Sequence, residues 1–499
     1  MCMRRACASL HSHGEAELSH GTISTTSQKL RFLSQAGDLD SALDLLQTEA
    51  NQRPLKDHSI YLSLLKSCTQ HKAHQQALRL YTHLSRHNLH ITPFLGENLV
   101  LALARCGALA CALQLFGRLP SRTVFSWTGI ISGFVENGHA LEAIRLHGHM
   151  IRDGHAPDRY TFASLFKAIG SIRDLSTGKT MHYQANSSGL GTDLFVVTSI
   201  LSMYGKCGDI AQAEDLFGTT LSRHHDVVCW NAMLTAYVDN SQGEKALLLY
   251  RQMQEVGVFS PTHQTIVVAL QACGMLTSDH KDIDMVLEIG EGLHSFARTN
   301  GILSHVFVHT TLVSMYGKCG AIIEAEDVFG AIFHRDVVAW NAMLTAYVEQ
   351  GMAEKALRLY RQMHEERVIL DQLMYVIAIQ ACTTLAEKQE KESLKMASLQ
   401  IGRSLHADAR RAGFLTNAFM FSTLVHMYSK CDSVKEAEHV FSPVLHQHNS
   451  VAWNVMISAY FAHKLEKKAL QLYRHMQEEG TVADQYSFTV ALQACGTLA

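Results

Sequence analysis

The chain repeats itself, and this repetition constrains its fold more than any other feature. The stretch DVVCWNAMLTAYVDNSQGEKALLLYRQMQEV at residues 226–256 returns 110 residues later as DVVAWNAMLTAYVEQGMAEKALRLYRQMHEE at 336–366, with 22 of 31 positions identical. A third copy begins at Asn449 as NSVAWNVMISAY. Near-copies of one short unit indicate a solenoid, in which each unit packs on its neighbours and the stack presents a long binding surface.

Three kinds of unit alternate in a fixed order. One carries VVxWNAML, as at 337–371, the second carries ALQACG, as at 263–305, and the third carries LVSMYGKCG, as at 306–336. Apolar residues in 337–371 recur from Trp340 at i, i+3, i+4, i+7 and i+8, which is the period of an amphipathic helix, and a second stripe follows after Gly351. Each unit is therefore predicted to be two helices, and the chain an all-α solenoid of helix-turn-helix repeats.

The repeats are predicted to span residues 23–499 as about thirteen units and a partial one. Residues 1–22 lie outside them, and their Arg4 and Arg5 suggest an organelle transit peptide, whereas Glu15 and Glu17 favour a plain disordered leader. Two units contain insertions, near 276–290 and 384–398, which we expect to extend into solvent or to contact a partner.

The composition excludes some functions and leaves others open. No apolar run reaches the roughly 18 residues that a membrane helix needs, so no membrane partner is expected. No CxxC pair occurs, so neither a zinc site nor a cofactor is predicted. The net charge of −3 counts mildly against a nucleic-acid partner, although a basic stripe on one face remains compatible with it.

The three motifs closely resemble the pentatricopeptide repeat family. VVAWNAMLTAYVEQG resembles its standard unit, LQACGML its long unit and VFVHTTLVSMYGKCG its short unit, and their alternation resembles the PLS subclass. This resemblance implies a right-handed superhelical solenoid that binds single-stranded RNA in an organelle, the mitochondrion or the chloroplast. The chain stops within a unit, at ALQACGTLA, so it is expected to lack, or to be truncated before, the family's C-terminal E and DYW domains.

Members of the family read one base per unit with two or three side chains. The resemblance implies that the fifth residue of a standard or short unit and its last residue choose the base, since amide and hydroxyl groups can pair with a base edge. Carried over, the implied pairs are Asn341 with Asp371 and Asn454 with Asp484 for uracil; Thr128 with Asp158, Thr198 with Asp226 and Thr310 with Asp336 for guanine; Ser422 with Asn449 for adenine; and Asn231 with Thr262 for a pyrimidine. The alternative interpretation of these residues is ordinary helix capping.

Some units depart from the family's pattern. Glu97 with Thr123 is not one of its usual pairs, and Ser27 with Asp57 is doubtful. The fifth residues of the long units, Ala163, Val267 and Val376, lack a side-chain hydrogen-bonding group and are expected to be spacers. The predicted target of the units from residue 124 onward is 5′-G-N-G-Y-N-G-U-N-A-U-3′.

Two further rows follow the repeat spacing. The second residue of each standard or short unit is apolar and is expected either to pack against a base or to lie in the core: Phe125, Phe195, Val228, Phe307, Val338, Phe419 and Val451. The thirteenth residue of each short unit is a cation, Arg105, Lys206, Lys318 or Lys430, which is expected either to follow the RNA phosphates or to be a solvated residue at a helix end.

Three functions remain open. The resemblance favours a site-recognition factor for C-to-U RNA editing that works with a deaminase-bearing partner. The alternatives are a factor for the stability, splicing or translation of an organelle RNA, and a solenoid that binds proteins. His13-Gly14-Glu15 fits the H-x-E half of a zinc-deaminase signature, but no P-C-x-x-C follows, so the chain is not expected to be an enzyme.

Overall fold

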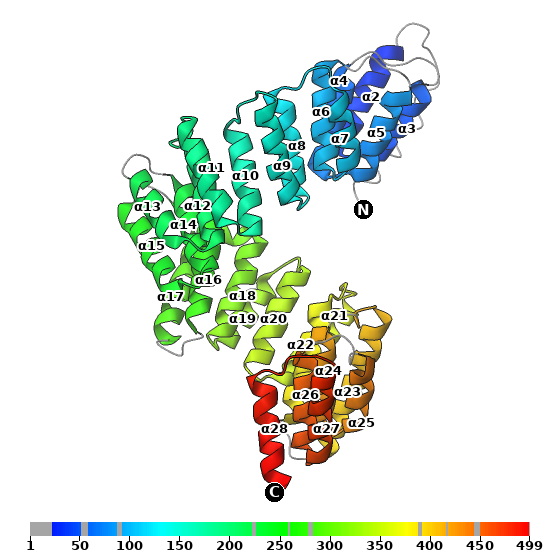
Figure 1. Ribbon diagram of the computed structural model, residues 1–499, viewed down its shortest axis with the longest axis vertical. Coiled ribbons are helices and arrows are strands. Elements are labelled where there is room, and N and C mark those ends of the chain that lie inside the picture. Colours follow the sequence, from blue (N-terminus) through cyan, green and yellow to red (C-terminus); the bar gives the residue numbers. More distant parts are fainter. Residues whose placement is uncertain are drawn as a thin grey trace. The chain divides into compact units, whose positions relative to one another are not determined.

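The computed structural model describes residues 22–50, 58–86, 92–221, 226–257, 260–277, 283–387, 392–415, 418–443 and 450–498. Apart from turns and short 3₁₀ segments, these residues are α-helical, and no strand occurs among them. The chain divides into two compact units, residues 1–240 and 241–499. The predicted all-α solenoid of helical hairpins is confirmed (Figure 1).

The first compact unit contains six hairpins followed by one further helix among its described residues. The helices are α2 (Thr22–Ala36), α3 (Leu39–Ala50), α4 (His58–His71), α5 (His74–Arg86), α6 (Pro93–Arg105), α7 (Leu109–Arg118), α8 (Val124–Glu136), α9 (Ala140–Arg152), α10 (Arg159–Ile172), α11 (Leu175–Ser187), α12 (Leu194–Cys207), α13 (Ile210–Leu221) and α14 (Val227–Asp239).

The second compact unit begins with one helix, continues with six hairpins and ends with a single helix, again among the described residues. The helices are α15 (Gly243–Val256), α16 (His263–Leu276), α17 (Ile283–Thr299), the 3₁₀ helix η2 (Ile302–Ser304), α18 (Val306–Lys318), α19 (Ile322–Ala331), α20 (Val337–Glu349), α21 (Ala353–Glu365), α22 (Gln372–Glu387), α23 (Glu392–Arg411), α24 (Ala418–Lys430), α25 (Val434–Phe441), α26 (Ser450–Ala462), α27 (Glu466–Glu478) and α28 (Gln485–Leu498).

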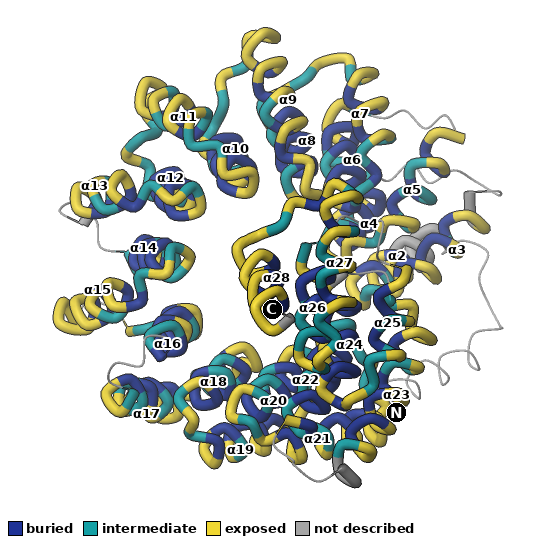
Figure 2. Tube along the Cα trace, turned by 60° about the horizontal axis from the view of Figure 1, so that its bottom comes forward, coloured by how far each residue is buried: buried dark blue, intermediate teal, exposed yellow. Residues whose placement is uncertain are grey.

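The first helices of successive hairpins form one layer within each compact unit. α6, α8, α10, α12 and α14 pack in that order, as do α16, α18, α20, α22, α24, α26 and α28. Each second helix packs on the first helix of its own hairpin and mostly on the next first helix as well. Figure 2 shows exposed residues along the outer side of α11 and α13 and buried residues where these helices meet α10 and α12.

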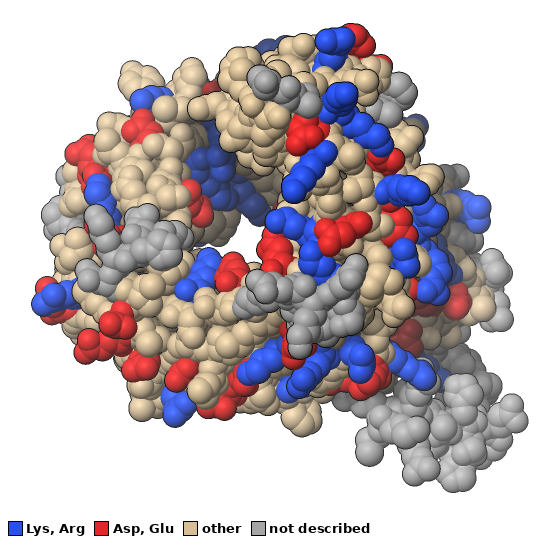
Figure 3. Space-filling model, turned by 90° about the horizontal axis from the view of Figure 1, so that it is seen from below, with Lys and Arg blue, Asp and Glu red and all other residues tan. Residues whose placement is uncertain are grey.

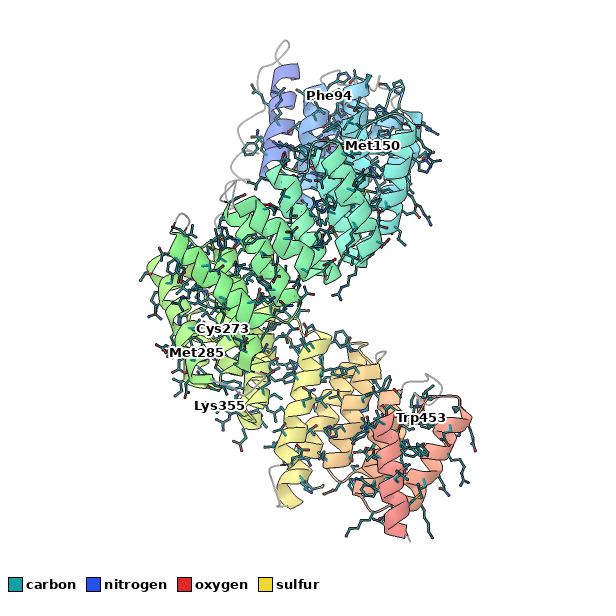
Figure 4. The ribbon with its side chains drawn as sticks, turned by 60° about the vertical axis from the view of Figure 1, so that its left-hand side comes forward. Phe94, Met150, Cys273, Met285, Lys355 and Trp453 are labelled. Atoms are coloured by element: carbon teal, nitrogen blue, oxygen red, sulfur yellow. The ribbon has the colours of Figure 1, made fainter. Side chains whose placement is uncertain are left out.

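The core between hairpins repeats an aromatic pair. A phenylalanine near the end of a second helix packs edge-to-face on the tryptophan of the next first helix: Phe116 on Trp127, Phe217 on Trp230, Phe329 on Trp340 and Phe441 on Trp453. Trp453 is labelled in Figure 4 and is fully buried. Such pairs favour edge-to-face geometry because the ring edge is positive and the face negative. The spacing of these residues thus sets the register of one hairpin on the next.

The predicted leader lies almost entirely outside the described residues, and the predicted insertions lie only partly outside them. Residues 1–21 are not described, and α2 begins at Thr22. Of the insertions, residues 278–282 and 388–391 are not described. Most described residues of the two insertions lie in the long helices α17, of 17 residues, and α23, of 20 residues. No helix among the described residues is long and apolar enough to span a membrane.

Candidate nucleic-acid interface

In most units the last residue caps the first helix of the next unit, although His305 does not. The carboxylate of Asp158 accepts a hydrogen bond from the Thr161 backbone N–H at 2.8 Å, and Asp336 accepts one from Ala339 at 2.8 Å. Capping oxygens satisfy N–H groups that have no partner inside the helix. These aspartates therefore cap helices, and in some units the same carboxylates make a second contact.

In two units the capping carboxylate also holds the fifth residue. Asn341 donates from Nδ2 to Oδ2 of Asp371 at 2.9 Å, while Oδ1 of Asp371 accepts the backbone N–H of Met374. Asn454 donates in the same way to Asp484 at 2.7 Å. Each aspartate thus uses one oxygen for the helix and the other for the asparagine, which fixes the orientation of the amide.

The fixed orientation leaves one amide atom without a partner. Oδ1 of Asn341 and Oδ1 of Asn454 are buried and accept no hydrogen bond from any described residue. A buried acceptor left in this state costs about 1–3 kcal/mol. The backbone N–H of Ser487, together with the Ser487 hydroxyl and the Asn454 amide, lowers the pKa of Asp484, which keeps this carboxylate an acceptor.

The threonine pairs differ from one another. The Thr128 hydroxyl lies 3.4 Å from Oδ1 of Asp158 and 2.6 Å from the Thr161 hydroxyl. Thr198 and Thr310 instead donate to backbone carbonyls of their own helices, and among the described residues neither bonds to its predicted partner, Asp226 or Asp336. A direct contact within a predicted guanine pair therefore occurs only for Thr128 in the described part of the chain.

Other predicted pairs are only partly described. Ser422 is buried, but Asn449 lies outside the described residues. Asp57 also lies outside them, as does the side chain of its predicted partner Ser27. Asn231 and Thr262 belong to different compact units; Asn231 is buried on α14 and Thr262 caps α16.

Most second residues of the units form a row of exposed apolar side chains on the first helices. The seven predicted positions are between 47% and 69% exposed, so the alternative that they lie in the core is not supported. The same row includes four residues that the sequence analysis did not name: Phe94, Tyr160, Leu373 and Tyr486, each half exposed or more. Applying the second-position rule to the long units and to unit 93–123 would have found them.

These rows meet in grooves along the first-helix layer. A groove of about 1170 Å³ in the first compact unit is lined by α6, α8, α10, α12 and α14 and contains Phe125, Thr128, Tyr160, Asp158 and Thr198. Its remaining predicted residues are Arg105, Phe195, Lys206, Asp226 and Val228. Two smaller grooves in the second compact unit repeat the combination, one with Thr310, Lys318, Val338 and Asn341 and one with Ser422, Lys430, Val451 and Asn454. Polar fifth residues, apolar second residues and cations thus share one surface in each groove.

The four predicted phosphate contacts are of two kinds. Arg105 lies 3.5 Å from Glu136, and Lys430 lies 2.6 Å from Glu387, so the charges of both are already compensated. Lys206 and Lys318 form no ion pair with another described residue and line the grooves. Figure 3 shows basic and acidic side chains interspersed over the face that it draws, which agrees with the nearly neutral total charge.

Among the described residues, no group of three or more His, Cys, Asp or Glu could hold a metal ion. The grooves are open to solvent and lined by groups that bond without a metal, so they differ from the enclosed sites that hold small molecules.

Comparison with known sequences points to one family. Residues 122–170, 225–275, 335–384 and 448–497 match the PPR repeat family model, and residues 195–222, 307–336 and 419–442 match the PPR repeat model. Together these segments cover more than half of the chain. Each of the seven segments begins within two residues of the start of a predicted standard or short unit.

The chain is similar to pentatricopeptide repeat-containing proteins of Arabidopsis thaliana. It is 33% identical over 402 residues to the chloroplastic protein At4g18520, covering 81% of this chain and 61% of that one. It is 29% identical over 447 residues to the mitochondrial protein At2g03380, covering 88% of this chain and 60% of that one. The chain therefore spans little more than half the length of these relatives.

A solved structure shares the fold. The crystal structure of the pentatricopeptide repeat protein PPR10 in complex with an 18-nt psaJ RNA element aligns with 99% of this chain and 74% of its own, with a TM-score of 0.68 and 16% identity. At 16% identity this similarity shows that the two proteins share a fold of helical hairpins, and no more.

Proposed function

Because the chain belongs to the pentatricopeptide repeat family, we propose that it binds single-stranded RNA in a sequence-specific manner. The observation that carries this proposal is a polar fifth residue held by a capping carboxylate beside an exposed apolar second residue, an arrangement that the units of Asn341 and Asn454 share. PPR10, which shares the fold, was solved with an RNA element bound.

The geometry suits an unpaired base in each unit. The exposed second residues offer stacking surfaces, and stacking adds affinity with little preference for a base. The Asn341 amide, oriented by Asp371, offers the Oδ1 acceptor and the second Nδ2 hydrogen side by side. Uracil presents an N–H next to a carbonyl on its Watson–Crick edge and thus matches this order. The proposed target remains 5′-G-N-G-Y-N-G-U-N-A-U-3′.

We also propose the cellular process in which the chain binds RNA. The alternation of standard, long and short units supports membership of the PLS subclass and a role as a site-recognition factor for C-to-U editing. Its relatives carry chloroplastic and mitochondrial names, which supports an organelle as its location. In this proposal a partner protein supplies the deaminase.

The base-reading part of the proposal is tested by Asn341→Thr. Threonine removes the amide donor that Asp371 holds, so binding to the U-containing target should weaken by about 1–3 kcal/mol. Binding to the RNA with guanine at that position should strengthen relative to the original target. Both affinities are measured by fluorescence anisotropy at one fixed salt concentration.

Asn300→Thr is the matched control, because Asn300 is exposed after the end of α17 and away from the grooves. It should leave both affinities unchanged. An unaltered preference in Asn341→Thr would contradict the assignment of Asn341. Equal binding of unrelated RNAs by the unmodified chain at low salt would contradict sequence-specific recognition itself.

The editing role is tested in cells that lack the protein. Loss of C-to-U conversion at a transcript containing the target would support it. Unchanged conversion with a reduced amount of that transcript would instead support a role in RNA stability.

A further inference from the structure

In unit 93–123 the fifth and last residues are not one of the family's usual pairs, but they contact each other as Asn341 and Asp371 do. Glu97 is its fifth residue, on α6, and Thr123 is its last residue, the N-cap of α8. The Thr123 hydroxyl donates a hydrogen bond to Oε1 of Glu97. This contact joins the same two positions that Asn341 and Asp371 occupy in their unit. Glu97 is 8% exposed, close to the 9% of Asn341.

The Thr123 hydroxyl determines which group donates and which accepts in its contact with Glu97. Thr123 Oγ1 accepts the backbone N–H of Ser126 as a helix cap and has a single hydrogen to donate, which it gives to Glu97. Oε1 of Glu97 is thereby held in place. Oε2 bonds to no described residue, yet it is not one of the buried atoms that lack a partner, so it retains contact with solvent.

Two exposed aromatic residues accompany this carboxylate. Phe94 lies three residues before Glu97 on α6, is 62% exposed and is labelled in Figure 4. Phe125 follows Thr123 by two residues on α8, which packs beside α6. Aromatic side chains at these two second positions offer larger stacking surfaces than the valines of the units at 337–371 and 450–484. The unit thus combines a held carboxylate with two exposed aromatic side chains on neighbouring helices.

A carboxylate selects among bases because it is an acceptor only. Guanine presents two adjacent N–H donors on its Watson–Crick edge, whereas adenine and cytosine place a ring acceptor next to their amino group and uracil places carbonyls on both sides of its N–H. We propose that unit 93–123 reads guanine through the Glu97 carboxylate, oriented by Thr123. This inference rests on the proposed RNA binding and extends the target by one base to 5′-G-G-N-G-Y-N-G-U-N-A-U-3′.

The test uses the full chain and four RNAs that differ only in the added 5′ base. Guanine there should bind on the order of tenfold more tightly than the other three bases, since good base readout is worth about 1–3 kcal/mol. Glu97→Gln keeps the size of the side chain and an acceptor for Thr123 but replaces one acceptor by a donor. It should lose the advantage of guanine, whereas Glu142→Gln, on the exposed side of α9, should keep it.

The results separate this inference from the proposed function. If the unmodified chain binds all four RNAs alike, or prefers another base, while a change opposite Asn341 still weakens binding, the guanine assignment is wrong and RNA recognition stands. If no base change alters binding anywhere, the proposed function fails as well. The panel with the unmodified chain decides the matter even if Glu97→Gln does not fold, which circular dichroism would reveal.

Discussion

At the scale of single residues, the capping carboxylates do two things at once. Asp371 holds a helix N-terminus with one oxygen and an asparagine with the other. A substitution there would disturb both stability and the proposed base reading, so it cannot separate the two. The fifth residues and the cations are better positions for tests, because they are outside the helix cap.

Lys318 and Lys430 occupy equivalent positions in their units, but we expect their substitution to affect RNA binding to different extents. Lys318→Ala should weaken binding of all RNAs alike and reduce the salt dependence of affinity by about 0.7 in the log–log slope, the value for one phosphate contact on a single strand. Lys430→Ala should have a smaller effect, because Glu387 already compensates its charge at 2.6 Å. Titrations at several salt concentrations measure both.

Exposed Lys435, which lies on α25, provides the control for loss of one positive charge. Equal slopes for Lys318→Ala and Lys435→Ala would show that Lys318 does not follow the phosphates.

At the scale of helices, neighbouring first helices approach closely at small residues. A Cβ added to Gly317 on α18 would lie 2.4 Å from Cβ of Ala346 on α20, and one added to Gly205 on α12 would lie 2.6 Å from Cβ of Ala236 on α14. A side chain at these glycines would push the helices apart and change the spacing of the residues proposed to read bases.

Gly317 and Gly330 give a matched pair of glycine-to-alanine changes. Gly317→Ala should destabilise the fold by about 1–3 kcal/mol through overpacking. Gly330→Ala, on α19 with no atom within 4 Å of the added Cβ, should stabilise it by about 0.5–1 kcal/mol because alanine loses less backbone freedom in a helix. Urea unfolding followed by circular dichroism compares them, and equal midpoints would contradict the close approach.

Three histidine–tyrosine pairs join long units to the short units that follow. Nδ1 of His182, His294 and His406 lies 2.9–3.0 Å from the hydroxyls of Tyr204, Tyr316 and Tyr428, respectively. Burial lowers the pKa of all three histidines below the ordinary value of 6.5. Their contribution to stability is complete above pH 6.5 and declines as the pH falls, because the unfolded chain then binds protons that the folded chain excludes.

The melting temperature should therefore fall between pH 7 and pH 5.5, and replacement of the three histidines by glutamine should flatten this dependence. Replacement of exposed His149 should leave it unchanged. A triple variant with the full pH dependence would assign the effect to other groups.

At the scale of the whole molecule, contacts between helices are local along the chain. Each helix contacts helices one or two places away, as α18 contacts α16, α19 and α20. Stability in such an array is approximately a sum of unit and neighbour terms. Damage in one hairpin is therefore expected to stay near it.

Hydrogen exchange tests this locality with Gly317→Val. Amide exchange should increase in α16, α18 and α20 and remain unchanged in α6, α8 and α10, which belong to the other compact unit. Increased exchange over the whole chain would show a cooperative fold instead.

The sequence by itself determined the helical hairpins, their order and the candidate site positions. Repeat spacing and amphipathic period specify local helices and the residues that share a face, whereas the exposure of the second residues was decided by the structure. The tertiary structure decided which polar groups meet. Asn341 bonds to Asp371 and Glu97 to Thr123, whereas Thr198 bonds to its own helix, and Lys430 is paired while Lys318 is not. The two contacts between fifth and last residues join positions 30 and 26 apart in the chain. A hydrogen bond between them depends on how closely and at what angle two helices pack, which spacing along the chain does not specify.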